Sequence, residues 1–337
     1  MNKNTKILVA LIAACAVVYF VWVRKPWSTL KGELKDFAIA DTGAVTKIFL
    51  AEKTGNKVLL SKLDDGTWLV DNTYKADPAK VNLLLSTMYN IKVRNPISEK
   101  EHNGIVKSMA TKSIKTEFYT GDKLLKTIYV GSATADQSGT FMLIEGSTMP
   151  FVTNIQGFVG YLTPRFYPFP IKWRSKEIFT VDPKNIASIK VHYPAKPAQS
   201  FEVKNGIEVA VNGTANKQSI TVNQGFAKYY LGSFTSLYFE GYDENIGKSE
   251  TDSIIALQPF CIIQLTTTAG KVAKLTVFYK PVGDHTKQLY DEEGNTLPFD
   301  QEKYFGVLNN ESNIGYIQQY TFGKIFKTLT DFAVGSN

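Results

Sequence analysis

The chain has 337 residues, of which 44% are hydrophobic and 12% aromatic, so it is long and apolar enough to bury a sizeable core and is not expected to be disordered. Its formal net charge is +7, but residues 1–35 alone carry +5 and leave only +2 (7 − 5) for the rest. A near-neutral globular part without a basic stripe argues against nucleic-acid binding, and we expect no nucleic acid among the partners.

The first predicted element is a membrane helix. Residues 7–23 form a run of seventeen residues without a charge, close to the shortest length that spans a bilayer. Trp22 and Trp27 suit the aromatic belt of a membrane interface, and Pro26 ends the helix. We therefore expect residues 1–35 to be a membrane anchor and linker. The anchor residues that we single out are Ile7, Leu11, Val18, Trp22 and Val23.

Other interpretations of this apolar run remain open. A cleaved signal peptide is disfavoured, because the run continues to Arg24 without a convincing cleavage site after it. A lipoprotein acylated at Cys15 is an alternative, since residues 12–15, IAAC, resemble a lipobox. Basic residues flank the run on both sides, so charge alone does not decide its orientation.

Residues 36–173 are predicted to form a first unit that is rich in antiparallel strands. The Asp65-Gly66 pair lies between two apolar runs and predicts a type I′ hairpin turn, in which both central residues need a positive φ. Turn residues also separate the other apolar runs of this unit. The strands that we expect cover residues 45–50, 57–60, 67–70, 113–119, 124–130, 141–144 and 150–152.

Helices are expected at two places in this unit. The first has Asp77 as its N-cap and Pro78 at its first helical position. Its apolar residues recur every three or four positions and are expected to lie on the sheet: Val81, Leu84, Leu85 and Met88. Asn154 is expected to cap a second, short helix that ends at Pro164, whereas residues 98–104 read as a polar connection.

Residues 174–337 repeat this order of elements with residues of similar kind. The segment EGSTMPF at residues 145–151 returns as EGNTLPF at residues 293–299, and Asn223 and Asp300 are expected to cap helices. The predicted fold class is therefore α+β, with two tandem repeats of an antiparallel sheet packed by helices, preceded by one N-terminal transmembrane helix. The alternative is that two β-rich domains merely share turn residues.

The C-terminal residues 314–332 have apolar side chains at helical spacing: Phe322, Ile325, Phe326 and Leu329. We expect this run to close the second unit. An amphipathic helix that faces a partner would have the same pattern.

An aromatic, proline-rich segment joins the two predicted units. Residues 166–173, FYPFPIKW, contain two prolines and cannot form a regular helix. One interpretation is a stiff linker whose rings fill the groove between the units. The other is an exposed aromatic ridge that binds a partner. The candidate partner surface consists of Phe166, Tyr167, Phe169 and Trp173.

The sequence contains no familiar catalytic or cofactor-binding motif. Nucleophile elbows, phosphate-binding loops, dinucleotide-binding glycines and zinc-protease motifs are absent. His102, His192 and His285 have no cysteine or histidine at the spacing of metal ligands. Cys15 lies in the membrane run and Cys261 in a predicted strand, so no intrachain disulfide is expected. We expect neither catalytic activity nor a cofactor or metal.

The assembled pattern resembles a bacterial family of domains of unknown function, numbered 4340. The resemblance covers nearly all of residues 36–330, and its motifs are structural, with no accepted catalytic residues to carry over. Similar domains occur in the extracytoplasmic part of auxiliary subunits of ABC-type transporters linked to gliding motility. This chain differs from them in having one membrane segment and no further transport-associated module. The motifs that carry the resemblance are Gly66-Thr67-Trp68, Asp77-Pro78, Val130-Gly131, Pro150-Phe151 and Trp173 to Phe179.

The resemblance implies a single-pass inner-membrane protein whose C-terminal region is periplasmic. We expect a non-catalytic, membrane-anchored scaffold or accessory subunit of a cell-envelope complex. The resemblance suggests that this complex is related to transport. Its expected partners are an inner-membrane protein complex and the lipid bilayer. The alternative is an extracytoplasmic binding module that captures a peptide, glycan or small ligand between the two repeats.

Overall fold

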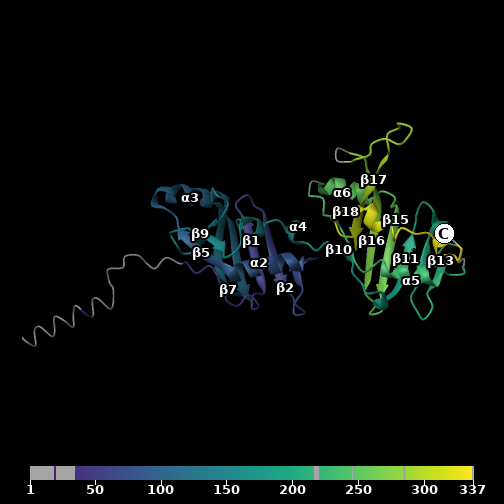
Figure 1. The fold of residues 1–337 in the computed structure, drawn as a ribbon, viewed down its shortest axis with the longest axis horizontal. Coiled ribbons are helices and arrows are strands. Elements are labelled where there is room, and N and C mark those ends of the chain that lie inside the picture. Colours follow the sequence, from purple (N-terminus) through teal and green to yellow (C-terminus); the bar gives the residue numbers. More distant parts are fainter. Residues whose placement is uncertain (1–18, 20–34, 216–219, 245, 284–285, 336–337) are drawn as a thin grey trace, which may run out of the picture. The chain divides into compact units, whose positions relative to one another are not determined.

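The computed structural model describes residue 19 and residues 35–215, 220–244, 246–283 and 286–335 (Figure 1). Within this part the chain divides into two compact units, the first ending at Arg174 and the second beginning at Ser175. Each unit combines antiparallel sheet with helices, which agrees with an α+β fold.

The first unit is built on a nine-stranded antiparallel sheet. Its strands are β1 (Lys47–Glu52), β2 (Lys57–Lys62), β3 (Trp68–Val70), β4 (Tyr74–Lys75), β5 (Ile91–Pro96), β6 (Ile114–Thr120), β7 (Lys123–Ala133), β8 (Thr140–Ile144) and β9 (Phe151–Ile155). They are arranged in the order β4-β3-β2-β1-β6-β7-β8-β9-β5. The helical elements are α2 (Pro78–Asn90), α3 (Glu99–Lys112), the 3₁₀ turn η1 (Thr163–Arg165) and α4 (Pro170–Trp173).

Helix α2 forms as its sequence predicts. The side chain of Asp77 accepts a hydrogen bond from the N–H of Ala79 at 3.0 Å, and Pro78 fits the first turn because that turn needs no N–H donor there. The apolar side of the helix is buried in the same core cluster as the strand residues Ile48 and Leu50. The buried apolar residues of the helix are Val81, Leu84 and Met88.

Helix α3 occupies the place where we expected a polar connection. Of its residues only Met109 is buried, so it lacks the apolar stripe by which a helix is recognised in a sequence. The hydroxyl of Ser98 donates to the carboxylate of Glu101 at 2.6 Å just before the helix. Glu99 and Glu101 in the first turn suit the positive end of the helix dipole.

Two local predictions in the first unit are wrong. Of the Asp65-Gly66 pair only Gly66 has a positive φ, +85°, and its N–H donates to the carbonyl of Leu63 at 2.9 Å. The hairpin therefore turns through a type I turn followed by a left-handed glycine, not a type I′ turn. Asn154 lies in strand β9, paired with β5, and caps no helix. Pro164 belongs to the 3₁₀ turn η1.

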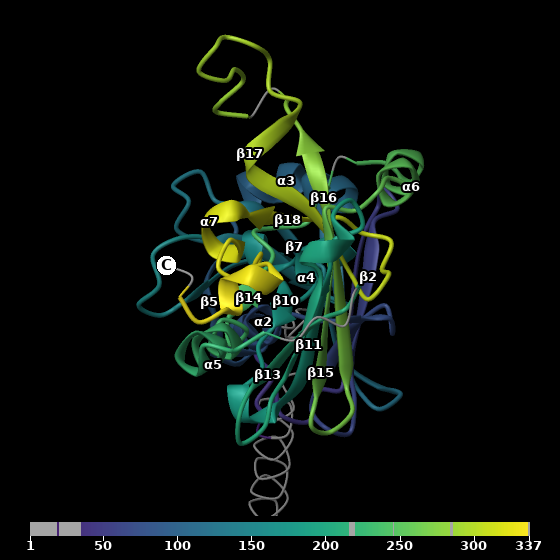
Figure 2. The ribbon, with the colours of Figure 1, turned by 90° about the vertical axis from the view of Figure 1, so that its right-hand side faces the viewer.

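The second unit contains a seven-stranded antiparallel sheet and a separate pair of short strands (Figure 2). Its strands are β10 (Glu177–Phe179), β11 (Ile186–His192), β12 (Phe201–Lys204), β13 (Ala210–Gly213), β14 (Leu237–Tyr238), β15 (Cys261–Thr267), β16 (Val272–Pro281), β17 (Phe299–Leu308) and β18 (Gly315–Gln318). The large sheet has the order β13-β12-β11-β15-β16-β17-β18, and β10 pairs with β14. Its helices are α5 (Gln224–Gly232), α6 (Lys248–Ile255) and α7 (Gln319–Phe322), with 3₁₀ turns η2 (Pro183–Asn185), η3 (Pro197–Gln199) and η4 (Leu329–Phe332).

The predicted caps and closing segment of this unit have different outcomes. Asn223 caps α5, accepting from the N–H of Phe226 at 3.1 Å. Asp300 caps no helix, because residues 299–308 form strand β17. The C-terminal run closes the unit as expected, although it forms β18, α7 and η4 and not one helix. Its buried core residues are Phe322, Ile325, Leu329 and Phe332.

Seven strands follow the same order in the two large sheets. The series β3-β2-β1-β6-β7-β8-β9 in the first unit corresponds to β13-β12-β11-β15-β16-β17-β18 in the second. Helices α2 and α5 follow the third strand of each series along the chain, and α3 and α6 precede the fourth.

The repeated segment that suggested a duplication does not occupy equivalent places. Residues 145–150 connect β8 to β9, whereas residues 293–298 lie in the preceding connection, between β16 and β17. That connection has 17 residues, 282–298, where the corresponding one in the first unit has 6, residues 134–139. Glycine and proline suit many turns, so a similar sequence serves two different connections.

Candidate functional site

Two of the four residues of the predicted aromatic ridge are buried. Trp173 is 0% exposed and Phe166 1%, and both belong to the core of the first unit. The indole N–H of Trp173 donates to the carbonyl of Tyr167 at 2.8 Å, and their rings meet edge to face at 5.7 Å. The N–H of Asp77, which caps α2, donates to the carbonyl of Trp173 at 2.7 Å. Within this segment Phe169 is the exposed aromatic residue, at 39%.

The predicted membrane anchor, apart from residue 19, lies outside the described residues. The residues singled out for it are Ile7, Leu11, Val18, Trp22 and Val23, and Cys15 belongs to the same segment. In the ranges that are described, no helix combines the length and the apolar character needed to cross a membrane.

The most distinctive feature of the second unit is the 17-residue connection between β16 and β17, which we call the arm (residues 282–298). It extends beyond the ends of both strands (Figures 1 and 2). Residues 284–285 within it lie outside the description. Leu289 is 39% exposed and Tyr290 57%, and Phe299 at the base is 37% exposed. The arm therefore presents apolar and aromatic side chains away from the core.

The arm has an ordered internal structure. The N–H of Leu297 donates to the carbonyl of Leu289 at 2.8 Å, and the N–H of Asp291 to the carbonyl of Asn295 at 2.9 Å. The carboxylate of Asp291 accepts from the N–H of Asn295 at 2.8 Å and from that of Glu293 at 3.0 Å. These bonds lower the pKa of Asp291, and the bond from the Asn295 N–H has the largest effect. The tip is thus a compact hairpin closed by a charged turn.

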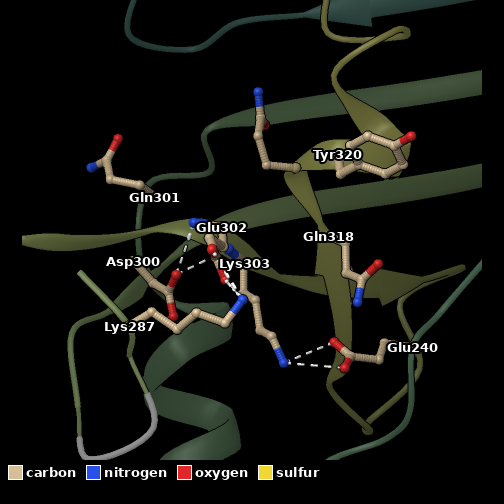
Figure 3. A pocket seen from close by; sticks show the side chains of 9 residues that line it. Glu240, Lys287, Asp300, Gln301, Glu302, Lys303, Gln318 and Tyr320 are labelled. Atoms are coloured by element: carbon tan, nitrogen blue, oxygen red, sulfur yellow. Dashed lines mark hydrogen bonds and ion pairs between the residues drawn. The ribbon is translucent and has the colours of Figure 1, made fainter.

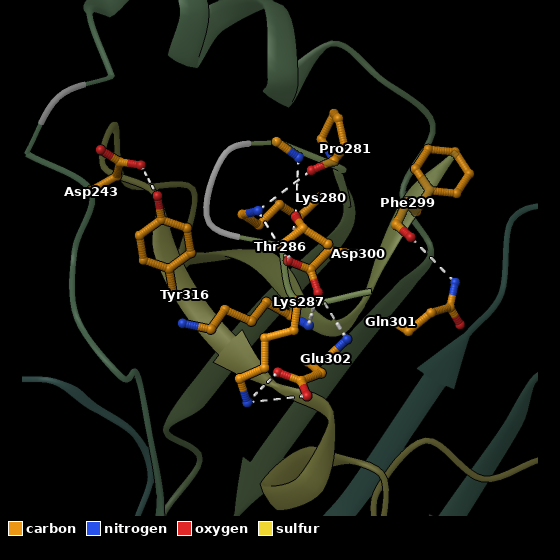
Figure 4. A network of polar contacts seen from close by, with 12 residues as sticks. Asp243, Lys280, Pro281, Thr286, Lys287, Phe299, Asp300, Gln301, Glu302 and Tyr316 are labelled. Carbon is orange, nitrogen blue, oxygen red and sulfur yellow. Dashed lines mark hydrogen bonds and ion pairs between the residues drawn. The ribbon is translucent and has the colours of Figure 1, made fainter. Parts of the chain in front are cut away.

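A buried ion pair holds the base of the arm. Lys280 of β16 and Asp300 of β17 lie 3.1 Å apart, with their side chains 15% and 4% exposed (Figure 4). The hydroxyl of Thr286, at the start of the arm, donates to the same carboxylate at 3.2 Å. The N–H groups of Glu302 and Lys303 donate to the other oxygen of Asp300 at 2.9 and 3.1 Å. Every oxygen of this carboxylate therefore has a partner, which a buried charge requires.

The electrostatics of Asp300 follow from these contacts. Burial raises its pKa, but the hydrogen bond from the Glu302 N–H, the Lys280 ammonium group and the Thr286 hydroxyl together outweigh burial. The net pKa of Asp300 is lower than its usual value. Sequence reasoning assigned Asp300 to a helix cap, because Lys280 lies twenty positions earlier and no local pattern links them.

A shallow polar hollow of about 640 Å³ lies beside the arm (Figure 3). Lys303 pairs with Glu240 at 2.9 Å, and Lys287 of the arm pairs with Glu302 at 3.0 Å. Tyr320 at its margin is 98% exposed. Each of these carboxylates has an ammonium partner, which suits a hydrated contact surface.

The first unit has a more apolar groove, of about 610 Å³, between α3 and the sheet. At one side the hydroxyl of Tyr129 donates to Glu145 at 2.5 Å. The pKa of Tyr129 is raised to about 12; this bond has the largest effect, and burial has the next largest. The connection from β8 to β9, which contains the first copy of the repeated segment, forms part of the wall. The principal lining residues are Val106, Met109, Ala110, Tyr129, Leu143 and Pro150.

The described histidines do not form a metal centre. His102 lies on α3, with its Nε2 3.3 Å from the carbonyl of Thr148. His192 lies in β11 of the other unit, with its Nδ1 3.4 Å from the hydroxyl of Ser200, which is buried and accepts the N–H of Tyr193 at 2.9 Å. Among the described residues no group of three or more metal-ligating side chains occurs. His285 is outside that part of the chain.

Fold and surface together define a two-unit protein of antiparallel sheets and helices, with a projecting arm in the second unit. The chain belongs to the family described as domain of unknown function (DUF4340), whose sequence model matches residues 68–253, more than half of the chain. The match begins in β3 and ends in α6, so it extends over both units. No curated protein and no solved structure matches the chain. The family resemblance drawn from the sequence is thereby confirmed.

Proposed function

We propose that this chain is a membrane-anchored, non-catalytic scaffold or accessory subunit of a cell-envelope complex. In this proposal the uncharged residues 7–23 form a single-pass anchor in the inner membrane, and both units lie on the periplasmic side. Transport is the process that the family resemblance suggests. A lipid-modified Cys15 would give the same attachment by another route.

The observation that carries this proposal is the arm. Its Leu289 and Tyr290 are exposed on a segment that adds nothing to the hydrophobic core, while its base is fixed by the buried pair of Lys280 and Asp300. Exposed apolar and aromatic side chains on an ordered projection are typical of protein-binding surfaces. The acidic tip, Asp291 to Glu293, favours a partner surface that is basic at its rim.

The two units support a scaffold in a second way. We infer that they are tandem copies of one α+β unit, because seven strands and two helices follow in corresponding order. The long arm distinguishes the second copy from the first, where the equivalent connection has 6 residues. A scaffold of two copies, of which only the second has a long arm, fits different functions for the two units.

Crosslinking and affinity capture of the full chain from native membranes test the proposal. We expect membrane proteins to co-purify with the wild-type chain and to be lost with the Leu289→Ser/Tyr290→Ser variant. The matched control is Leu257→Ser/Tyr229→Ser, which removes side chains that are 54% and 64% exposed elsewhere on the same unit. This control is expected to retain the partners.

Two results would contradict the proposal. The first is that no membrane protein is captured with the wild-type chain under crosslinking conditions. The second is that the arm variant and the control capture the same proteins in the same amounts, which would exclude the arm as the contact. Protease accessibility of the units in spheroplasts, compared with lysed cells, tests the periplasmic location separately.

A second candidate function is capture of a peptide, glycan or small ligand. The groove beneath α3 favours it, because its volume of about 610 Å³ and its mainly apolar wall are within the range of small-molecule sites. Ligand binding to the folded state alone raises the melting temperature. A screen by thermal shift that finds a soluble ligand, whose effect is abolished by Met109→Trp, would support this function over the scaffold.

A further inference from the structure

Residues 36–39 fix the path by which the chain enters the first unit. Phe37 is 1% exposed and meets Phe151 edge to face at 6.2 Å, and the N–H of Ile39 donates to the carbonyl of Met88 at 2.9 Å. The ammonium group of Lys126, on β7, donates to the carbonyls of Asp36 and Ala38, each at 2.5 Å. The N-terminal segment therefore leaves the unit at one defined place, beside β7.

Two leucines are exposed at that place. Leu124 is 49% exposed and Leu125 38%, and both line a surface hollow of about 560 Å³ together with Lys35 and Asp36. Successive residues of a regular strand face opposite sides of the sheet. Here a β-bulge intervenes, because Tyr119 pairs with Leu124 and Phe118 with Lys126, which leaves Leu125 without a partner in the register. Bulges commonly redirect side chains in this way.

The charges around the leucines are mixed, with basic groups at the edge. Asp122 is paired with Lys47 at 3.3 Å, Asp36 lies 3.8 Å from Lys126, and Glu145 accepts from the hydroxyl of Tyr129. Lys35 and Lys123 are exposed and add positive charge next to the leucines. Apolar side chains flanked by lysines are typical of surfaces that rest on a lipid headgroup layer, since lysine stems lie along apolar surface while their ammonium groups reach phosphate.

The chain outside the described structure indicates what covers this surface. If residues 7–23 are the membrane helix, the linker from Val23 to Lys35 has 12 residues and reaches at most about 40 Å when fully extended. The point where the chain enters the unit therefore lies within about 40 Å of the end of the membrane helix. We propose that the surface around Leu124 and Leu125 rests on the headgroup layer of the membrane, so that the first unit is docked against the bilayer as well as tethered to it.

This inference rests on the proposed anchor and is tested with the full chain in liposomes of neutral and anionic phospholipids. A bimane label is placed on Leu125→Cys in a Cys15→Ala background, where the remaining Cys261 is fully buried. The matched control is Val159→Cys. Val159 is 95% exposed and follows β9, and β9 runs away from the β6–β7 turn, so this position lies away from Leu124 and Leu125. Lipids brominated near the headgroup serve as quenchers.

We expect brominated lipid to quench the label at 125 and to leave the label at 159 unchanged. Flotation of both proteins with the liposomes is measured in the same samples. Flotation without quenching at 125, or equal quenching at both positions, would overturn the docking while the anchor stands. Failure of the full chain to float would overturn the anchor and the docking together. In native membranes, photocrosslinking of position 125 to a protein in place of lipid would assign the surface to a protein partner and also overturn the proposal.

Discussion

Gly306 and Gly315 lie directly opposite each other on β17 and β18, and both border the ring of Phe239. Phe239 is 3% exposed and belongs to the core of the second unit. A Cβ at Gly306 would lie 2.9 Å from Cε1 of this ring, and a Cβ at Gly315 would overlap the ring as well. Neither glycine has a positive φ. Glycine is required here because the ring of Phe239, and at Gly306 also the side chain of Ile317, occupies the space that a Cβ would need.

Gly315→Ala is therefore expected to destabilise the protein by overpacking, by about 1–3 kcal/mol. Denaturant unfolding measures this change in the free energy of unfolding. Gly232→Ala is the control, since no heavy atom lies within 4 Å of its Cβ position and alanine favours the helical state. Equal unfolding midpoints for Gly315→Ala and the wild type would show that the ring of Phe239 does not pack against Gly315 in this way.

The buried location of Trp173 gives a prediction that separates core from surface. Trp173→Ala is expected to lower the free energy of unfolding by about 3–5 kcal/mol, because it opens a large cavity in the first unit. Phe169→Ala, four positions earlier, removes a ring that is 39% exposed and is expected to cost much less. Thermal or denaturant unfolding compares the two variants. A larger effect of Phe169→Ala would contradict the buried position of the indole.

The ion pair at the base of the arm predicts an asymmetry between single and double variants. Asp300→Asn leaves the ammonium group of Lys280 buried without its counter-charge and is expected to cost about 3 kcal/mol. Lys280→Met/Asp300→Leu removes both charges and is expected to recover much of that loss. Glu302→Gln, in an exposed pair with Lys287, is expected to change stability by less than about 1 kcal/mol. A double variant that is less stable than Asp300→Asn would contradict this account.

The same pair contributes to stability in a pH-dependent way. The pKa of Asp300 is lower in the folded state than its unfolded value of about 4. Its contribution is therefore complete above that unfolded pKa and is lost as the pH falls through the folded pKa. Unfolding curves recorded between neutral pH and acid are expected to show this loss in the wild type. The loss should be smaller in the Lys280→Met/Asp300→Leu variant, and identical profiles would argue against the pair.

The hydrogen bonds of two tyrosines in the first sheet predict a loss of stability at alkaline pH. Tyr119 donates to Glu117 at 2.6 Å and Tyr129 to Glu145 at 2.5 Å, and in each case the bond to the carboxylate, followed by burial, raises the tyrosine pKa to about 12. Because the folded pKa lies above the unfolded value of about 10, the stabilisation is complete below pH 10 and is lost as the pH rises through 12.

Carbon-13 NMR of the tyrosine ring carbons that bear the hydroxyl groups measures these titrations residue by residue. Glu117→Gln is expected to move the pKa of Tyr119 toward 10 and to have a smaller effect on Tyr129, to which Glu117 contributes least. Titration of Tyr119 near pH 10 in the wild type would show that its bond to Glu117 is not formed.

Sequence patterns were sufficient for several elements whose structure depends on neighbours in the chain. The helix that begins at Pro78 follows from its cap and its apolar spacing, and the helix after Asn223 follows in the same way. Strands β1, β2, β6 and β7 lie where alternating apolar residues and turn glycines predicted them. These signals are local, since capping bonds and side-chain periodicity act over a few residues.

The sequence alone thus determined the family, the α+β character of the fold and most of the regular elements. Only the tertiary structure decided that Trp173 and Phe166 are buried, that α3 is a helix despite its polar surface, and that residues 293–298 belong to an arm. It also decided that Lys280 meets Asp300 in a buried pair. These features depend on contacts between distant segments, in which burial and strand register, not local preference, fix the environment of each side chain.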